Sequence, residues 1–397
     1  MHDANAPIAP TARTPSRAAA MRKTLAWVLN SSRPRYGVAS ADTVRIADFF
    51  CGCGGLTLGA AEAANRFGRA IDVRFAVDFD DDAAAVYREN FSDCASEIEQ
   101  NDIRRFIDGE IGTPPTPTEQ SLRRRCGPLH AIFAGPPCQG HSDLNNSTRR
   151  DDPRNRLYIR AARAVEVLRP EVTVIENVPG VVHDKSDVVG ETTRALENIG
   201  YSVTTAVIDL QNLGLPQRRR RHVLFASLSP DISISDILPV APGEGRVSIG
   251  PFIAGLEDEP QQSKCLVCRP ARLTPDNERR VEYLFRRKLY DLPDAMRPPC
   301  HRDKPHSYQS VYGRMRWEQP AQTITSGFGS PGQGRFIHPR KRRLITPHEA
   351  ARIQGFPDFY RFSAATGLTA LRTMIGNAVP PPLTIAILTA LLKGRLI

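Results

Sequence analysis

The sequence predicts an α/β fold in which a mostly parallel sheet carries helices on both faces. Short apolar strands alternate with helical stretches from Val44 to about Leu228, as in successive strand–helix units. The first strand leads into a glycine turn and then into an alanine-rich helix. Ligands of such folds bind at the carboxyl ends of the strands, so functional residues are expected directly after each strand.

Six apolar segments predict the strands. In chain order they span residues 44–50, 73–80, 129–135, 171–177, 201–210 and 222–228. Helices are expected over residues 56–68, 81–91, 158–170 and 191–200. Further along, Thr346 followed by Pro347 and Glu349 is a helix-start signal. The apolar segment 380–397 predicts a last helix that packs back onto the first domain.

The alternation of strands and helices stops near Leu228, and residues 230–340 are irregular, proline-rich and basic. This change of composition indicates a second, smaller domain. The expected parts are a flexible basic arm at 1–42, a main domain at 43–230 plus 366–397, and a smaller domain with its hinge at 231–365. The arm is interpreted either as a transit peptide or as a mobile segment that touches phosphates.

Composition points to a polyanionic partner. The 397 residues include 53 Lys and Arg against 43 Asp and Glu, a net charge of +10, so nucleic acid is the leading candidate and a merely soluble basic protein is the alternative. The eight cysteines come without a secretory signal, which predicts reduced thiols and a cytoplasmic protein. No apolar run approaches the ~18 residues of a membrane span, so no membrane partner is expected.

The first glycine turn predicts a cofactor site. Three glycines follow the first strand within four residues, Gly52, Gly54 and Gly55, and permit a tight turn close to a ligand. An ordinary strand-to-helix turn is the alternative. Asp78 ends the next strand, where an acid accepts hydrogen bonds from ribose hydroxyls, and Phe79 beside it is placed to stack on an adenine.

Asp102 and Ile103 lie where a third strand end would reach the same adenine. The glycine spacing does not fit the G-x-G-x-x-G fingerprint, which makes a nicotinamide cofactor less favoured than another adenosine-containing one.

A thiol, an acid and two arginines are expected beside this pocket. Pro136 and Pro137 hold the loop before Cys138 extended, which would fix a nucleophile before the substrate arrives. Glu176 ends another strand at the active-site edge. Arg219 and Arg221 point the same way if their segment is extended. The alternatives are a structural cysteine, a surface carboxylate and a solvated charge run.

The motifs that contain these residues resemble the DNA (cytosine-5)-methyltransferase family. They are, in the family's order, DFFCGCGG, VDFD, NDI, GPPCQGHS, ENVPG, GLPQRRRRHVLFA, RLITPHEAARIQGFPD and GNAVP. The resemblance implies a Rossmann-like methyltransferase domain that uses S-adenosylmethionine. It makes Cys138 the nucleophile on cytosine C6, Glu176 the partner of the ring N3 and amine, and Arg221 the contact to O2, with Arg219 supporting the loop.

The resemblance also implies cofactor and DNA contacts. Cofactor-contacting positions of the family match Phe50, Asp78, Phe79, Asp102, Ile103, Pro137 and Asn377, together with the three glycines, although Asp78 departs from the commoner glutamate. Positions that contact DNA around a flipped base match Gln139 and Ser142, while Arg149 and Arg150 are expected to touch phosphates.

The resemblance makes the smaller domain the target-recognition domain. Gln309 or Arg314 is the candidate reader of base edges. A structural zinc site is also expected, from Cys265, Cys268, Cys300 and His301, with His306 as an alternative ligand to His301. Two buried thiols with an exposed histidine are the alternative.

The sequence therefore predicts a monomeric methylase of duplex DNA, either solitary or paired with a cognate restriction endonuclease. One rival is a tRNA-cytosine methyltransferase on the same fold, which would be expected to have a shorter insert than residues 230–340. The other is a catalytically silent DNA-binding module, against which the presence of Cys138, Glu176 and Arg221 argues.

Overall fold

A computed structural model describes residues 16–37, 42–137, 156–230, 232–241, 243–257, 265–302 and 311–397. Its centre is a seven-stranded sheet in the order β3-β2-β1-β4-β5-β8-β6. The strands are β1 Thr43–Phe49, β2 Ala70–Asp78, β3 Ile98–Gln100, β4 Ala131–Ala134, β5 Val172–Asn177, β6 Ser202–Asp209 and β8 Arg220–Ser227. The predicted α/β fold with a mostly parallel sheet is confirmed, since only β8 runs antiparallel to its neighbours β5 and β6.

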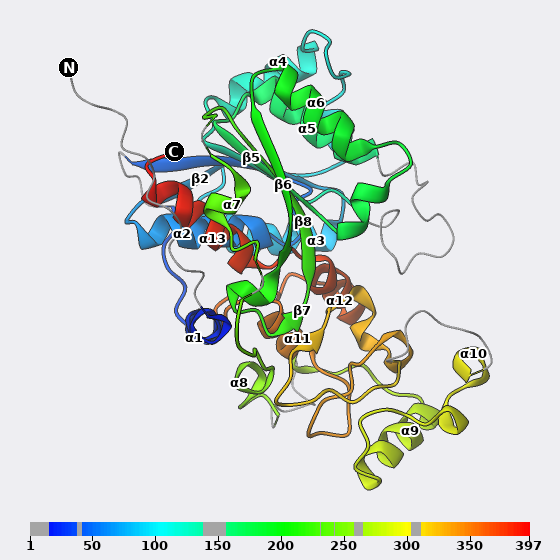
Figure 1. Cartoon of the computed structure of the whole chain (residues 1–397). Helices are drawn as coiled ribbons and strands as arrows, with labels where there is room; N and C mark the ends of the chain where they lie inside the picture. Colours follow the sequence, from blue (N-terminus) through cyan, green and yellow to red (C-terminus); the bar gives the residue numbers. More distant parts are fainter. Residues whose placement is uncertain are drawn as a thin grey trace.

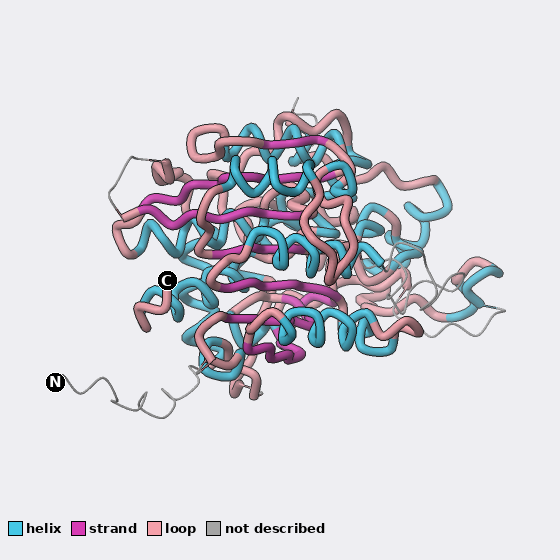
Figure 2. Tube along the Cα trace, turned by 90° about the horizontal axis from the view of Figure 1, so that it is seen from above, coloured by secondary structure: helices cyan, strands magenta, loops and turns pink. Residues whose placement is uncertain are grey.

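Helices cover both faces of the sheet (Figure 1). One face carries α4 Pro117–Cys126, α5 Leu157–Leu168 and α6 Val188–Asn198, and the other carries α2 Gly55–Arg66, α3 Asp81–Phe91 and α13 Pro381–Lys393. Figure 2 shows the strands lying side by side with helices crossing over them. Helix α4 was not expected from the sequence, although Thr116 and Glu119 form a capping box at its start.

The last helix closes the main lobe, as predicted. Helix α13 packs along α2, far away in the sequence. The segment Leu368–Lys393 is long and apolar enough to cross a membrane by length and composition alone. It is divided, however, into α12 Leu368–Asn377 and α13 at a proline-rich turn, and most of its apolar window is buried within the molecule. Helices α12 and α13 are therefore part of the protein core in this structure.

Part of the N-terminal arm is folded. Helix α1 Arg17–Val28 buries Trp27, whose indole Nε1 donates to the Gly355 carbonyl oxygen at 3.2 Å. Arg17 pairs with Asp209 at the end of β6, with 2.9 Å between Nη2 and Oδ2. These contacts fix α1 against both the main lobe and the segment after α11.

Residues 232–345 are here called the smaller lobe; α7 Ile234–Ile237 packs beside β6 and α13, whereas the other described elements of this lobe lie below the sheet in Figure 1. Short elements dominate: α7, α8 Gly250–Ile253, α9 Pro275–Arg286, α10 Pro299–Arg302 and β9 Ala321–Gln322. Its 3-10 helices are η5 Leu266–Cys268, η6 Asp294–Met296, η7 Ser326–Gly329 and η8 Pro331–Gln333. The main lobe adds η1 Ile103–Arg105, η3 Pro179–His183 and η4 Leu210–Leu213, and α11 Pro347–Ile353 follows the smaller lobe.

Strands β7 Gln217–Arg218 and β9 pair in parallel and join the two lobes. The Gln217 side chain reinforces this junction. Its Nε2 donates to the Gln354 Oε1 at 2.7 Å, and its Oε1 accepts from the Ile324 amide at 3.1 Å. The loop that precedes β8 is therefore tied to the smaller lobe by a buried side chain.

Candidate active site

The glycine turn after β1 has the backbone that the sequence predicted. Phe50, Gly52 and Gly54 all have positive φ, of 57°, 52° and 85°, and a positive φ is uncommon for a residue such as phenylalanine. A Cβ built on Gly55 would lie 2.1 Å from the Val379 carbonyl oxygen. The GNAVP segment that contains Asn377 therefore lies against the turn, and Gly55 permits that close approach.

Asp78 holds the turn in place. Its Oδ2 accepts from the Gly52 amide at 2.7 Å, and its Oδ1 accepts from the Asp80 amide at 2.9 Å. Burial raises the pKa of Asp78, and these backbone hydrogen bonds oppose that rise. Each carboxylate oxygen keeps a second lone pair, so ribose hydroxyls can still be bound here.

Phe79 lies beside a hollow of about 550 Å³ at the ends of β2 and β3. Its ring is 76% exposed, the largest exposure among the big apolar side chains described. Residues lining the hollow are Phe79, Gln100, Asn101, Asp102, Arg104 and Arg105. A flat apolar ring next to polar groups fits an adenine with its ribose, and Ile103 is buried directly behind Asp102.

Asp102 is pre-oriented by a local ion pair. Its Oδ2 lies 2.5 Å from Arg104 Nη2, and its Oδ1 accepts from the Arg104 amide at 2.9 Å. The hydrogen bond from Arg104 lowers the pKa of Asp102. The carboxylate is thus held as an acceptor at the rim of the hollow.

Glu176 and Arg221 meet at the same edge of the sheet, one at the end of β5 and one in β8. Their Oε1 and Nε atoms are 2.6 Å apart, and both side chains are about nine-tenths buried. Opposite Glu176 in the antiparallel pair is Val223, so Arg221, two residues before Val223, lies on the same face of the sheet as Glu176. The sequence did not predict this ion pair, because it follows from the antiparallel register of β8.

Arg219 is buried and serves as a clamp on the backbone. Its guanidinium donates to the carbonyl oxygens of Ile324 at 2.9 Å and Ala378 at 2.9 Å, and approaches that of Gly376 at 3.5 Å. The side chain is 1% exposed. Arg219 therefore holds the GNAVP segment and the smaller lobe against the loop before β8, which fits the supporting role expected of it.

The nucleophile loop is anchored at its first proline. The Asn177 Nδ2 donates to the Pro136 carbonyl oxygen at 3.3 Å. Pro137 is the last residue described before residue 156, and Cys138, Gln139, Ser142, Arg149 and Arg150 lie outside the described residues. Gln309 does as well. The anchor places the chain entering Cys138 next to Glu176.

Arg314 is partly buried, and its guanidinium is engaged by neighbouring groups of the protein. It lies 4.0 Å from the centroid of the Phe285 ring, and its Nε donates to the Pro339 carbonyl oxygen at 2.8 Å. Burial lowers the pKa of Arg314. These contacts make it a support for α9.

The zinc prediction is not supported. In the described part of the chain, no group of three or more His, Cys, Asp or Glu side chains is arranged to hold a metal ion. Cys265 and Cys300 are exposed, and Cys268 is partly buried. His301 instead packs edge-on against the Tyr312 ring at 5.5 Å between centroids, and His306 lies outside the described residues. Cysteine and histidine are suitable zinc ligands, but the C-x₂-C spacing of Cys265 and Cys268 does not by itself bring Cys300 and His301 next to them.

This arrangement of sheet, glycine turn and strand-end acids defines a Rossmann-like methyltransferase fold. A structure described as a DNA modification methyltransferase encoded within a prophage of E. coli superposes with a TM-score of 0.61 at 26% identity, covering 88% of this chain and 99% of that one. The structure of Dnmt2 from S. pombe gives a TM-score of 0.58 at 20% identity, which shows the fold alone.

Sequence comparison gives the family. The C-5 cytosine-specific DNA methylase model matches residues 44–393. The chain is 44% identical over 361 residues to the Type II methyltransferase M1.BsuMI of Bacillus subtilis, which covers 90% of this chain and 82% of that protein. It is 31% identical over 345 residues to the Type II methylase M.HgiDII of Herpetosiphon aurantiacus, covering 84% and 91%. The chain belongs to the C-5 cytosine-specific DNA methylases, so the predicted resemblance is confirmed and the protein is a DNA (cytosine-5)-methyltransferase. This family membership implies S-adenosylmethionine as the methyl donor.

Proposed function

We propose that the enzyme methylates C5 of a cytosine flipped out of a specific double-stranded DNA sequence, through a covalent bond between Cys138 and C6. The observation that carries this proposal is the meeting of Glu176, Arg221 and the anchored Pro136 at one sheet edge. These features bring a carboxylate and a guanidinium together beside the start of the loop that carries the proposed thiol.

Cytosine C5 is a poor nucleophile, and this determines the residues that the reaction needs. The Cys138 thiolate adds to C6, which breaks the aromatic system and makes C5 enamine-like. When bound, S-adenosylmethionine would supply the methyl group that C5 takes, and its sulfonium would become a neutral thioether. A base then removes the C5 proton, and the bond between sulfur and C6 breaks to restore the ring.

Glu176 hydrogen-bonds the ring N3 and the exocyclic amine, and so stabilises the charge that develops during addition. Arg221 contacts O2 from the same side. Because the two side chains already pair in the protein, both are oriented before the base enters. Positive charge from the nearby arginines also favours the thiolate form of Cys138.

The cofactor residues fit an adenosine with a ribose. The exposed Phe79 ring offers a stacking surface, and Asp78 and Asp102 offer acceptors at neighbouring strand ends. Phe50, the three glycines, Pro137 and Asn377 complete the set proposed to hold S-adenosylmethionine. Asn377 is exposed beside the glycine turn, in a segment whose backbone Arg219 fixes.

The relatives named Type II methyltransferases support a further proposal about context. We infer that the enzyme protects bacterial DNA in the cytoplasm as a monomer, within a restriction-modification system that has a cognate endonuclease. Gln139, Ser142, Arg149 and Arg150 remain predicted DNA contacts around the flipped base.

A duplex that contains 5-fluorocytosine at the target position tests the covalent step. Fluorine at C5 cannot leave as a proton, so the bond to C6 persists and the protein–DNA adduct survives denaturing electrophoresis. We expect the adduct with the wild-type chain and with Cys300→Ser, whose thiol is exposed in the smaller lobe, but not with Cys138→Ser. An adduct formed by Cys138→Ser would contradict the proposed nucleophile. Methyl transfer to tRNA in place of duplex DNA would favour the RNA rival.

A further inference from the structure

Helix α9 is built as a surface that presents charge. Its inner face buries Val281 and Leu284, while its outer face carries Glu278, Arg279, Glu282 and Arg286. Positions 278, 282 and 286 are separated by four residues each, so their side chains follow one stripe along the helix. An exposed stripe of this kind is most often simply solvated, so further evidence is needed to assign a partner.

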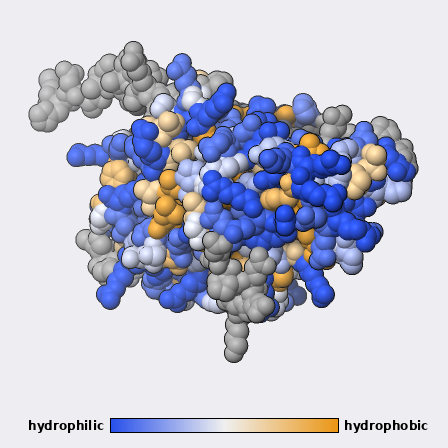
Figure 3. All heavy atoms as spheres, turned by 90° about the horizontal axis from the view of Figure 1, so that it is seen from below, coloured by the Kyte–Doolittle hydropathy of each residue, from blue (hydrophilic) through white to orange (hydrophobic). Residues whose placement is uncertain are grey.

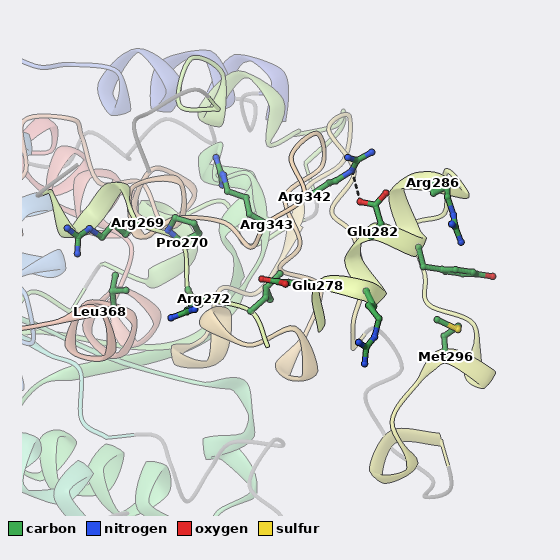
Figure 4. Close-up of a pocket in the computed structure, with 14 residues that line it drawn as sticks. Arg269, Pro270, Arg272, Glu278, Glu282, Arg286, Met296, Arg342, Arg343 and Leu368 are labelled. Carbon is green, nitrogen blue, oxygen red and sulfur yellow. Dashed lines mark ion pairs between the residues drawn. The ribbon is translucent and has the colours of Figure 1, made fainter. Parts of the chain in front are cut away.

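That evidence is a trough of about 930 Å³ between α9 and the rest of the smaller lobe (Figure 4). One wall is the outer face of α9. The opposite wall consists of the segment 269–273 with Arg342, Arg343 and the first residue of α12. Six arginines line the trough: Arg269, Arg272, Arg279, Arg286, Arg342 and Arg343. Figure 3 shows that this end of the molecule is mostly hydrophilic, with hydrophobic residues only in small groups.

Three of these arginines have acidic partners within the protein. Arg342 pairs with Glu282 across the trough at 3.1 Å, Arg343 pairs with Glu349 at 2.8 Å, and Arg279 pairs with Asp276. In contrast, the exposed side chains of Arg272, Arg286 and Glu278 make no hydrogen bond or ion pair within the described ranges. Figure 4 shows these three side chains around the trough.

Aromatic stacking holds α9 rigidly from behind. Arg314 stacks on Phe285 at 4.0 Å, and Arg280 lies 5.5 Å from the centroid of Tyr312 while its Nε donates to the Met296 carbonyl oxygen at 3.1 Å. A supported helix positions its outer side chains accurately, as recognition of a base edge requires.

We propose that α9 reads G·C base pairs in the major groove, with Arg286 donating to a guanine and Glu278 accepting from a cytosine amine. A guanidinium fork matches guanine O6 and N7, and a carboxylate matches the cytosine N4 amine. Arg272 on the opposite wall binds a phosphate of the same duplex.

The stripe from Glu278 to Arg286 rises ~12 Å, at ~1.5 Å per residue. This length spans about three to four base pairs at ~3.4 Å each. The inference rests on the proposed function, since it names part of the DNA that the enzyme methylates.

The test maps 5-methylcytosine in DNA from a host that expresses each variant, and then measures methylation of the mapped site and of its single-base neighbours. We expect Glu278→Gln and Arg286→Lys each to lose discrimination by about 5- to 150-fold at one G·C pair, because amide and ammonium cannot reproduce the original pairing. Arg272→Ala should weaken binding to all DNA sequences alike. It should also reduce the slope of log binding constant against log salt concentration by about one.

The matched control is Arg287→Lys, at the residue that caps the end of α9 and lies outside the trough, which should keep the wild-type motif. Thermal midpoints within a few degrees of the wild type show that each variant is folded. A wild-type host without 5-methylcytosine would overturn the proposed function itself. A methylating wild type whose Glu278→Gln and Arg286→Lys variants keep the same motif with the same discrimination would overturn only the role of α9.

Discussion

Glu176 and Arg221 form an ion pair at the carboxyl edge of β5, with 2.6 Å between Oε1 and Nε. Each side chain is about nine-tenths buried, so each charge depends on the other for compensation. The pair also stands where the target cytosine is proposed to bind. Stability and catalysis are therefore coupled at this position.

Removal of one side chain of the Glu176–Arg221 pair should lower the free energy of unfolding more than removal of both side chains. We expect Arg221→Ala to lower the free energy of unfolding by about 3 kcal/mol, because Glu176 is left buried and unpaired. Glu176→Gln should slow methyl transfer by about 10²- to 10³-fold, since it removes charge stabilisation in the transition state. A double-mutant cycle with Glu176→Ala and Arg221→Ala, read by denaturant unfolding, checks the coupling. Additive effects would contradict it.

Arg219→Ala should destabilise the junction between the lobes. The guanidinium holds carbonyl oxygens of Ile324 and Ala378, so we expect a loss of about 3 kcal/mol and weaker cofactor binding. Arg219→Lys should rescue little, because an ammonium cannot reproduce the planar fork. Urea unfolding with the exposed neighbour variant Arg220→Ala as control measures the effect. An equal decrease in the free energy of unfolding for Arg219→Ala and Arg220→Ala would contradict a special role of the buried Arg219 side chain.

Asn177→Asp should slow the chemical step while folding is kept. The substitution retains the Oδ1 that accepts from the Val178 amide but removes the Nδ2 that donates to the Pro136 carbonyl. A small displacement of Cys138 then costs up to about 100-fold in rate. Single-turnover methylation at saturating cofactor measures this. An unchanged rate would mean that the nucleophile loop does not need the anchor.

Asp48 should make stability depend on pH. Burial raises the pKa of Asp48 to about 7, although the Thr57 hydroxyl donates to its Oδ2 at 2.6 Å. Because the folded state binds the proton more tightly than the unfolded state, this group's contribution is most favourable at low pH. It declines as the pH rises from about 4 to 7 and is constant above that window. Asp48→Asn should remove the decline, so its free energy of unfolding relative to wild type should rise across this window. A constant difference between the two proteins from pH 4 to 8 would contradict the raised pKa.

Site residues that follow directly after a strand could be predicted from the neighbouring sequence. The glycine turn, Asp78 and Phe79 follow strand ends that alternation alone predicts; in the structure Asp78 accepts from the Gly52 amide of the turn, and Phe79 beside it lines the hollow. The Arg221–Glu176 pair required the antiparallel register of β8, which no local pattern specifies. Arg219 contacts residues more than one hundred positions away, and so does Trp27 of the N-terminal arm.

The smaller lobe was predicted least well, for a physical reason. Apart from α9, its described helices and strands are short, and arginine–aromatic stacking and ion pairs hold them in place. Arg314 was expected to read bases; the sequence did not predict that its guanidinium stacks on the Phe285 ring and donates to the Pro339 carbonyl oxygen. The charged residues of α9 are spaced four apart in the sequence, but the inference that they bind DNA also needed the arginines on the opposite wall of the trough.

The contact between Gly55 and Val379 has a consequence for biosynthesis. Helix α2, which follows the cofactor turn, packs against α13, so translation must pass Lys393 before the two helices can meet completely. A ribosome-bound chain that stops before residue 381 would leave exposed the side of α2 that α13 covers. Competence to bind the methyl donor should therefore be acquired only after α13 has been synthesised and has docked on α2.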